Sequence, residues 1–350
     1  MSKPDTSLLP RSPAAFFTWC AVLLIAAAPM ALAHVRWFVE SDATVENFEA
    51  YNLTDPAVLT WIAIVFTLVG ISVVLDMRLP RVRVVDSKTR HDFIEILRIF
   101  TGMSLLLTAY EGAIVAPHLE AYGTFGGILI AAEAIIGILL IANRFVRHAA
   151  CMMILLQLGL AIQFGILSAF EYFIMIGIAL FLLINNLPTA ELREQYKPFS
   201  VAILRICAGI SLITLGFSEK LFGAIMAESF LAAYQWNFVS ALGFEWFTDR
   251  LFVLSAGFME VTFGVILVLG TTTRLNVLAL SFVLAASNII FILEGNNEAA
   301  MVEFIGHMPI IGAALVLLLL GYGQRWRVTN LLSRERFNLN IRTLRVPSDA

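Results

Sequence analysis

Apolar runs long enough to cross a bilayer divide this chain, and they restrict its fold more than any other feature of the sequence. A run of roughly 20 apolar residues spans the hydrocarbon core as a helix, because a helix satisfies its own backbone hydrogen bonds. Charged residues make up only 14% of the chain, whereas soluble domains contain about 25%. The sequence therefore predicts an all-α, polytopic membrane helical bundle whose main partner is the lipid bilayer. No basic tract interleaved with aromatic residues indicates nucleic-acid binding.

Nine apolar runs follow the N-terminal segment, and each predicts one transmembrane helix. They cover residues 57–75, 93–115, 124–142, 149–169, 171–187, 201–222, 251–270, 275–293 and 302–322. The count becomes ten if the N-terminal segment is also retained as a helix.

The N-terminus has the three parts of a secretory signal peptide. Lys3 and Arg11 precede an apolar stretch that ends in Ala31-Leu32-Ala33, a small-residue cleavage pattern. We expect residues 1–33 to be a signal peptide, so that cleavage makes His34 the first residue of the mature protein. The alternative is an uncleaved first membrane helix.

The charges of the loops predict the orientation of the helices. Basic residues gather in every second connection, at 78–90, 144–147 and 193–197, and again in the tail from 325 onward. The alternate connections are acidic or neutral. Basic loops stay in the cytoplasm, so we expect a multi-pass protein of the cell inner (plasma) membrane, with His34 on the periplasmic or extracellular side and the C-terminus in the cytoplasm.

An internal repeat divides the membrane part into two similar units. Ile96-Leu97-Arg98-Ile99 recurs as Ile203-Leu204-Arg205-Ile206, and Glu133-x-x-x-Gly137 recurs as Glu260-x-x-x-Gly264. An even number of spans separates the copies, so the two units are parallel. The predicted domains are therefore an N-terminal part over 34–92 with an extra membrane helix, four-helix repeats over 93–199 and 200–323, and a basic tail over 324–350.

The motifs of these units resemble the DoxX family of four-helix membrane proteins. The resemblance rests on Leu204-Arg205-Ile206, on Glu260 and Gly264, on Thr273-Arg274-Leu275, and on the final Gly-Tyr-Gly-Gln-Arg-Trp at 321–326. It is closest over 200–327 and weaker over 93–187, where Phe145-Val146-Arg147-His148 replaces Thr-Arg-Leu. The family includes the membrane subunit of thiosulfate:quinone oxidoreductase. The resemblance thus implies a redox-associated subunit, linked to quinone or to a partner oxidoreductase.

Two arginines and two glutamates fall inside predicted spans. Arg98 and Arg205 lie near the cytoplasmic side, and Glu133 and Glu260 lie near mid-span in the following helix. Their depths differ by roughly 6 Å at 1.5 Å of rise per residue, and a charge in the bilayer normally has a partner. We therefore expect Arg98–Glu133 and Arg205–Glu260 pairs. They serve either to hold each unit together or to form a quinone or proton site.

Three histidines, His34, His118 and His307, are predicted on the non-cytoplasmic side. Glu111, Glu171 and Glu303 occupy the same zone, and Glu303 and His307 share one helical face. Imidazoles bind transition metals, copper among them, and a mature N-terminal His34 adds its free amine. The sequence thus offers a copper site at the outer face, beside the simpler interpretation of three unrelated histidines. Trp37 and Phe38 are expected to anchor His34 at the membrane interface.

Three functions remain open on the sequence alone. The first is a redox subunit that works with quinone or with a partner oxidoreductase. The second is a copper-binding membrane protein, whose partner would be periplasmic. The third is a non-catalytic scaffold or a carrier of small solutes.

Overall fold

The computed structural model describes residues 34–39, 45, 48–79, 87–320 and 325–332. The expected signal peptide over 1–33, the basic residues 80–86 and the tail from 333 to 350 lie outside the described residues. The cleavage at Ala33 therefore stays a prediction.

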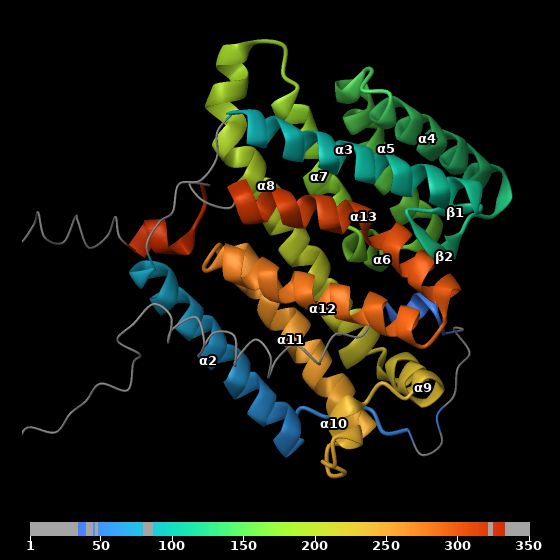
Figure 1. Ribbon diagram of the computed structural model, residues 1–350, viewed down its shortest axis with the longest axis vertical. Coiled ribbons are helices and arrows are strands. Elements are labelled where there is room, and N and C mark those ends of the chain that lie inside the picture. The colour runs from blue at the N-terminus through green and yellow to red at the C-terminus, as the bar shows by residue number, and fades with distance from the viewer. Residues whose placement is uncertain (1–33, 40–44, 46–47, 80–86, 321–324, 333–350) are drawn as a thin grey trace, which may run out of the picture.

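The described residues are mainly helical (Figure 1). The elements are η2 (Val35–Trp37), α2 (Pro56–Arg78), α3 (Ser87–Tyr110), β1 (Ala113–Ile114), β2 (Ala116–Glu120), α4 (Gly123–Ile141), α5 (Val146–Phe164), α6 (Ile166–Glu171), α7 (Ile174–Asn185), α8 (Ala190–Leu215), η3 (Gly216–Leu221), α9 (Ala224–Tyr234), α10 (Phe238–Ala241), α11 (Asp249–Leu269), α12 (Thr273–Leu293) and α13 (Asn297–Leu320). Strands β1 and β2 form one short antiparallel hairpin.

Eight helices in the described part of the chain are long and apolar enough to cross a membrane. They are α2, α3, α4, α5, α8 continued into η3, α11, α12 and α13. The predicted polytopic helical bundle is confirmed at this level. The run over 171–187 differs from its prediction, because it forms only the 12-residue helix α7.

The bundle is built from helices that pack in neighbouring pairs. Helix α8 packs along both α7 and α11, and α3 packs between α4 and α13. Helix α12 lies on α13, and α5 contacts α4 and α7. Helix α2 lies at one edge of the bundle against α11, while α4 and α5 lie at the opposite edge (Figure 1).

Glycines allow two of these helix pairs to approach closely. A Cβ atom on Gly102 of α3 would lie 3.0 Å from the carbonyl oxygen of Gly137 on α4. A Cβ atom on Gly209 of α8 would lie 2.6 Å from the carbonyl oxygen of Gly264 on α11. Small residues at such crossings bring helix backbones together in lipid, where no hydrophobic effect drives helices to associate.

The two buried arginines cap helix ends and do not pair with the glutamates expected. Arg98 donates to the carbonyl oxygens of Leu140 and Ile141 at the end of α4, and it forms an ion pair with Glu95. The Arg98–Glu133 prediction is therefore wrong. The last carbonyls of a helix lack intrahelical donors and carry partial negative charge, so a guanidinium satisfies them well.

Arg205 plays the same part at the end of α11. It donates to the carbonyl oxygens of Leu267 and Val268, and to that of Trp326 at 2.8 Å. Glu260 forms its ion pair with Lys220 instead, so the Arg205–Glu260 prediction is also wrong. We call this end of the bundle the Arg205 end, and the opposite one the His34 end.

Helix α2 is fastened at both ends. At the Arg205 end, its buried Asp76 forms an ion pair with Arg327 and accepts a hydrogen bond from Thr329 at 2.6 Å. At the His34 end, Asp55 forms an ion pair with Arg250 at 3.0 Å. The Asp55 contact joins α2 to α11, and the Asp76 contacts join it to residues that follow α13. Most of the surface of α2 is not covered by other helices.

Two helices are interrupted at the His34 end. The chain leaves regular helix between α6 and α7, at Tyr172 and Phe173, and α8 continues as the π-helix η3. Interruptions at membrane depth are tolerated where the backbone is buried in protein or lines a cavity, and π-helical turns are frequent at functional sites. Both interruptions place polar residues at the same end of the bundle.

Candidate functional site

The segment from His34 to Val39 is folded into the His34 end of the bundle. Val35 is fully buried, and Trp37 donates from Nε1 to the hydroxyl oxygen of Tyr172 at 3.2 Å. The Trp37 ring packs directly on Gly306 of α13. Phe38 contacts aromatic rings of α9 and α12. These two aromatic side chains thus face the interior, not the membrane interface where we expected them.

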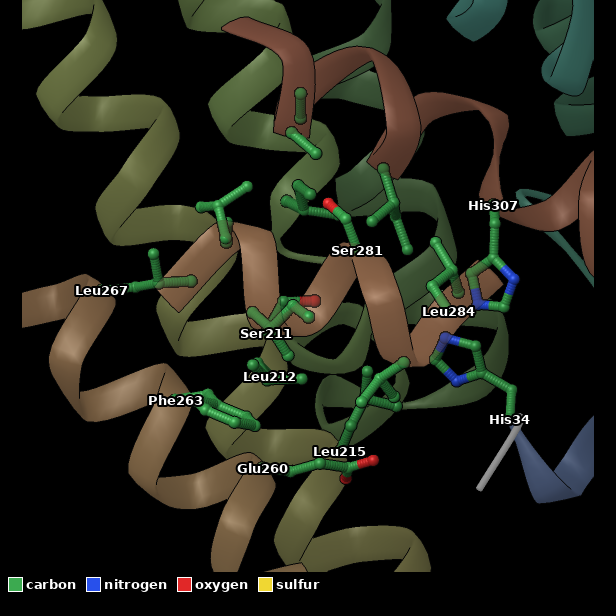
Figure 2. A pocket seen from close by; sticks show the side chains of 18 of the residues that line it. His34, Ser211, Leu212, Leu215, Glu260, Phe263, Leu267, Ser281, Leu284 and His307 are labelled. Carbon is green, nitrogen blue, oxygen red and sulfur yellow. The ribbon is translucent and has the colours of Figure 1, made fainter. Parts of the chain in front are cut away.

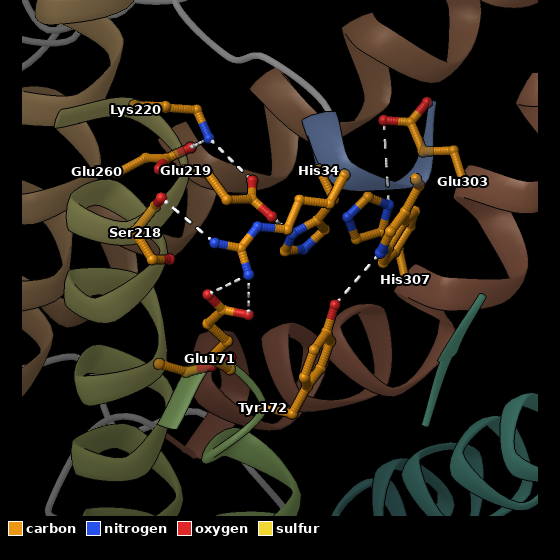
Figure 3. Close-up of polar contacts among 12 residues, drawn as sticks. His34, Glu171, Tyr172, Ser218, Glu219, Lys220, Glu260, Glu303 and His307 are labelled. Atoms are coloured by element: carbon orange, nitrogen blue, oxygen red, sulfur yellow. Dashed lines mark hydrogen bonds and ion pairs between the residues drawn. The ribbon is translucent and has the colours of Figure 1, made fainter. Parts of the chain in front are cut away.

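Arg36 links this segment to both interrupted helices. Its Nη1 atom lies 2.8 Å from Oε1 of Glu171 at the end of α6, and its Nη2 donates to the carbonyl oxygen of Ser218 in η3 at 3.4 Å (Figure 3). The contact gives the buried Glu171 side chain a cationic partner. A short N-terminal segment therefore supplies a cation to the centre of the site.

The π-helix presents Glu219 and Lys220 to the same interior. Lys220 is 1% exposed, and its Nζ lies 2.9 Å from Oε1 of Glu260 and 3.6 Å from Oε2 of Glu219. Oε1 of Glu219 lies 3.6 Å from Nδ1 of His34 (Figure 3). Buried charges need such partners, since desolvation of an isolated ion is very costly.

His34 and His307 meet at the edge of this cluster. Their rings are stacked with centroids 5.2 Å apart, and His34 also stacks on Trp37 at 4.4 Å. Nδ1 of His307 lies 4.0 Å from Oε1 of Glu303, which accepts a hydrogen bond from Ser287 at 2.6 Å. The structure therefore brings together two of the three histidines selected from the sequence, with Glu171 and Glu303 near them.

His118 and Glu111 stand apart from this pair. The ring of His118 lies 6.1 Å from that of Tyr172, and neither of its nitrogens has a hydrogen-bond partner among the described residues. Burial lowers the pKa of His118 to about 4, so its imidazole is neutral near pH 7. Glu111 is exposed. In the described part of the chain, no three His, Cys, Asp or Glu side chains are arranged to hold a metal ion.

An elongated cavity begins at the charged cluster and runs toward the Arg205 end (Figure 2). Part of this space is open to the outside. His34, Lys220, Glu260, Glu303 and His307 line its polar end. The rest of the wall is mainly apolar, with Leu215, Phe263, Leu267, Leu284, Ile310 and Leu317 among its residues.

Glu133, which matches Glu260 in the repeat, has a different environment. It is fully buried, and Oε1 accepts hydrogen bonds from Thr108 Oγ1 at 2.6 Å and from the Val115 amide at 3.0 Å. It does not line the cavity described above. The two glutamates therefore differ in role. Glu133 connects the loop at Val115 to α4 by a hydrogen bond, whereas Glu260 lines the cavity beside Lys220.

Several residues of the site were not selected from the sequence. Arg36, Tyr172, Glu219 and Lys220 are all central to the cluster. The adjacent charges Glu219 and Lys220 fall near the end of a predicted span, where charged residues usually reach water. The position of Glu219 and Lys220 inside a predicted span was the sequence feature that could have marked them as site residues. For Arg36, the corresponding feature was its place two residues after His34.

Comparisons with protein-family models, with curated proteins and with solved structures give no match. The DoxX resemblance therefore stays a proposal. The functional interpretation rests on the geometry of the cluster and the cavity.

Proposed function

We propose that this protein is a DoxX-like membrane subunit of a redox system and that its cavity binds a quinone. The observation that carries the proposal is an apolar cavity that ends at a Lys220–Glu260 ion pair beside His307. Ligand pockets typically have apolar walls and a few polar groups that orient the ligand. A quinone has the matching division into a polar head and an apolar tail.

The polar end offers the groups that a quinone head requires. The Lys220 ammonium donates hydrogen bonds, which suits a quinone carbonyl, and the Glu260 carboxylate accepts one, which suits a quinol hydroxyl. His307 lines the same end and adds an imidazole whose Nδ1 has no hydrogen-bond partner among the described residues. Electrons would be exchanged with a partner oxidoreductase, as the family resemblance implies.

Matching contacts support the proposed duplication of a DoxX-like unit. Arg98 and Arg205 cap α4 and α11 in the same manner, and the Gly102–Gly137 and Gly209–Gly264 crossings correspond. On this proposal the first unit is structural and the second carries the site. The loop charges favour a plasma-membrane protein with its His34 end on the non-cytoplasmic side.

The test uses the full-length protein purified in mild detergent. Quinone is extracted and quantified, and quinol turnover is measured with membranes that contain the partner enzyme. Glu260→Gln should lower quinone content and turnover, while the matched Glu133→Gln variant should change neither. A wild-type protein that neither retains nor binds quinone contradicts the proposal.

A copper site is the second candidate, and the juxtaposition of His34 and His307 favours it. Their rings lie 5.2 Å apart between Glu219 and Glu303, which gives imidazole and carboxylate donors in one place. Elemental analysis of the purified protein, together with sequencing of its mature N-terminus, tests this candidate. Copper that is lost in His34→Ala and His307→Ala would support it. If the protein binds neither metal nor quinone, the remaining hypothesis is a non-catalytic scaffold or a carrier of small solutes.

A further inference from the structure

The apolar part of the cavity has a limited length. On α13 the lining residues of the cavity extend from Glu303 to Leu317, fourteen residues later, which corresponds to about 21 Å of helical rise. On the facing helix α11 it extends from Ala256 to Leu267. A head group held at Lys220 leaves space for only a short tail, so a longer tail has to leave the cavity.

Helix α12 forms one wall of the cavity and is attached mainly to α13. In its half near the His34 end, Ser287 donates to Glu303 at 2.6 Å and Asn288 donates to the carbonyl oxygen of Ala300 at 2.8 Å. Its hydrogen bond with α11 is at the opposite end, from Asn276 to the carbonyl oxygen of Phe263 at 2.8 Å. Helix α12 therefore follows α13 and touches α11 much less.

The cavity lies where α11 and α12 separate. Glu260 and Phe263 of α11 line it, as do Ser281 and Leu284 of α12 (Figure 2). These four side chains are only partly buried. A different face of α12 carries Ile289, which is 53% exposed and faces the surroundings of the bundle. The wall of the cavity is thus one helix thick at this place, with lipid beyond it.

We infer that the cavity opens into the bilayer between α11 and α12, and that its ligand is a long-tailed molecule whose tail passes through this opening past Ser281. The inference rests on the proposed quinone site and deepens it. It assigns Ser281 and Leu284 to the tail, and Lys220 and Glu260 to the head. The small Ser281 side chain leaves room for the tail, and a large side chain at this position obstructs it.

Binding of two quinones by the purified full-length protein tests the inference. One quinone carries a long isoprenoid tail, and the other has the same head group without it. Ser281→Trp should weaken binding of the tailed quinone at least tenfold and change binding of the tailless quinone less than threefold. Ile289→Trp is the matched control on the lipid face of α12, and it should alter neither.

A second measurement covers the case in which Ser281→Trp does not fold. Ser281→Cys, made in a variant without the native cysteines, is labelled with a membrane-soluble maleimide, and the tailed quinone should slow the labelling while the tailless one does not. Equal binding of the tailed quinone by wild type and Ser281→Trp, or labelling that the tailed quinone leaves unchanged, overturns the opening but leaves the quinone site intact. If the wild type binds neither quinone, the quinone site and the opening both fail.

Discussion

The Nζ atom of Lys220 in the π-helix lies 2.9 Å from Oε1 of Glu260 on α11, and this ion pair closes the polar end of the cavity. The pair joins two elements that are neighbours in the bundle but are separated in sequence by α9 and α10. Lys220 is buried and Glu260 is only partly exposed, so each charge depends on the other. Their mutual dependence gives the first prediction.

Lys220→Met should lower the free energy of unfolding by about 3–5 kcal/mol, because it leaves the largely buried Glu260 carboxylate without its cation. The double variant Lys220→Met/Glu260→Gln should recover much of this loss, since it removes both charges. Thermal unfolding in detergent, followed by circular dichroism, measures the effect. A double variant that is no more stable than Lys220→Met would contradict the pairing.

Gly270→Ala should destabilise the protein more than Gly295→Ala. Both glycines have positive φ angles, +74° and +77°, so each alanine is expected to cost about 1–2 kcal/mol in backbone strain. At Gly270 the added Cβ would also lie 2.6 Å from Nη1 of Arg205, whereas at Gly295 it meets nothing within 4 Å. The difference between the two midpoints of thermal unfolding isolates the contact with Arg205. Equal midpoints would show that the Arg205 side chain moves away from the added Cβ without loss of stability.

Asp76→Asn should destabilise the protein strongly, and Asp55→Asn only slightly. Asp76 is buried and forms an ion pair with Arg327, so we expect a loss of about 3–5 kcal/mol. Asp55 forms a surface pair with Arg250, and such pairs contribute little. Urea unfolding of both variants in the same detergent provides the comparison, and similar losses would refute the ranking.

The Asp55 pair should also have a defined pH dependence. Hydrogen bonds from the Asn52 amide and from Arg250 lower the pKa of Asp55 below its usual 3.8. The unfolded state therefore binds the proton more readily, and the contribution to stability is complete above pH 3.8 and is lost as the pH falls below it. Between pH 6 and pH 8 the wild type and Asp55→Asn should differ by a constant amount.

Gly306→Ala should displace the segment from His34 to Val39. Its Cβ would lie 2.2 Å from the Trp37 ring, so we expect Trp37 to leave its place and the fluorescence of the protein to change. Gly127→Ala is the control, because nothing lies within 4 Å of that position and alanine favours a helix. Limited proteolysis near His34 should increase only in Gly306→Ala. Unchanged proteolysis in that variant would mean that the segment is held by other contacts.

The membrane architecture could be predicted from the sequence because it depends on apolar runs alone. The runs that contain Gly102, Gly137, Gly209 and Gly264 became packed helices, and the alternation of loop charge suggested their order across the bilayer. The interruptions at Tyr172 and in the π-helix could not be predicted. They depend on burial against other helices, and Glu219 and Lys220 alone do not distinguish a π-turn from the end of a span.

The site could be predicted only in part, for a geometric reason. Counting residues along a span gives the depth of Arg98 or Glu133 but not the direction in which either side chain points, so a small difference in depth suggested pairs that do not form. The structure places His34, His307 and Glu303 close together at one end of the bundle, while the metal site expected there stays a prediction. His118 shares that end but not that position.

The contacts of the His34 segment also set the order in which the protein can assemble. Trp37 precedes every long helix that the structure describes, yet Gly306, on which it packs, belongs to the last of these helices. The segment has no complete binding place until α13 has been synthesised and inserted, so the cluster is completed only after α13 has joined the bundle. Loss of α13 by truncation would remove one side of the site around Arg36 and His34, even if the earlier helices had formed correctly.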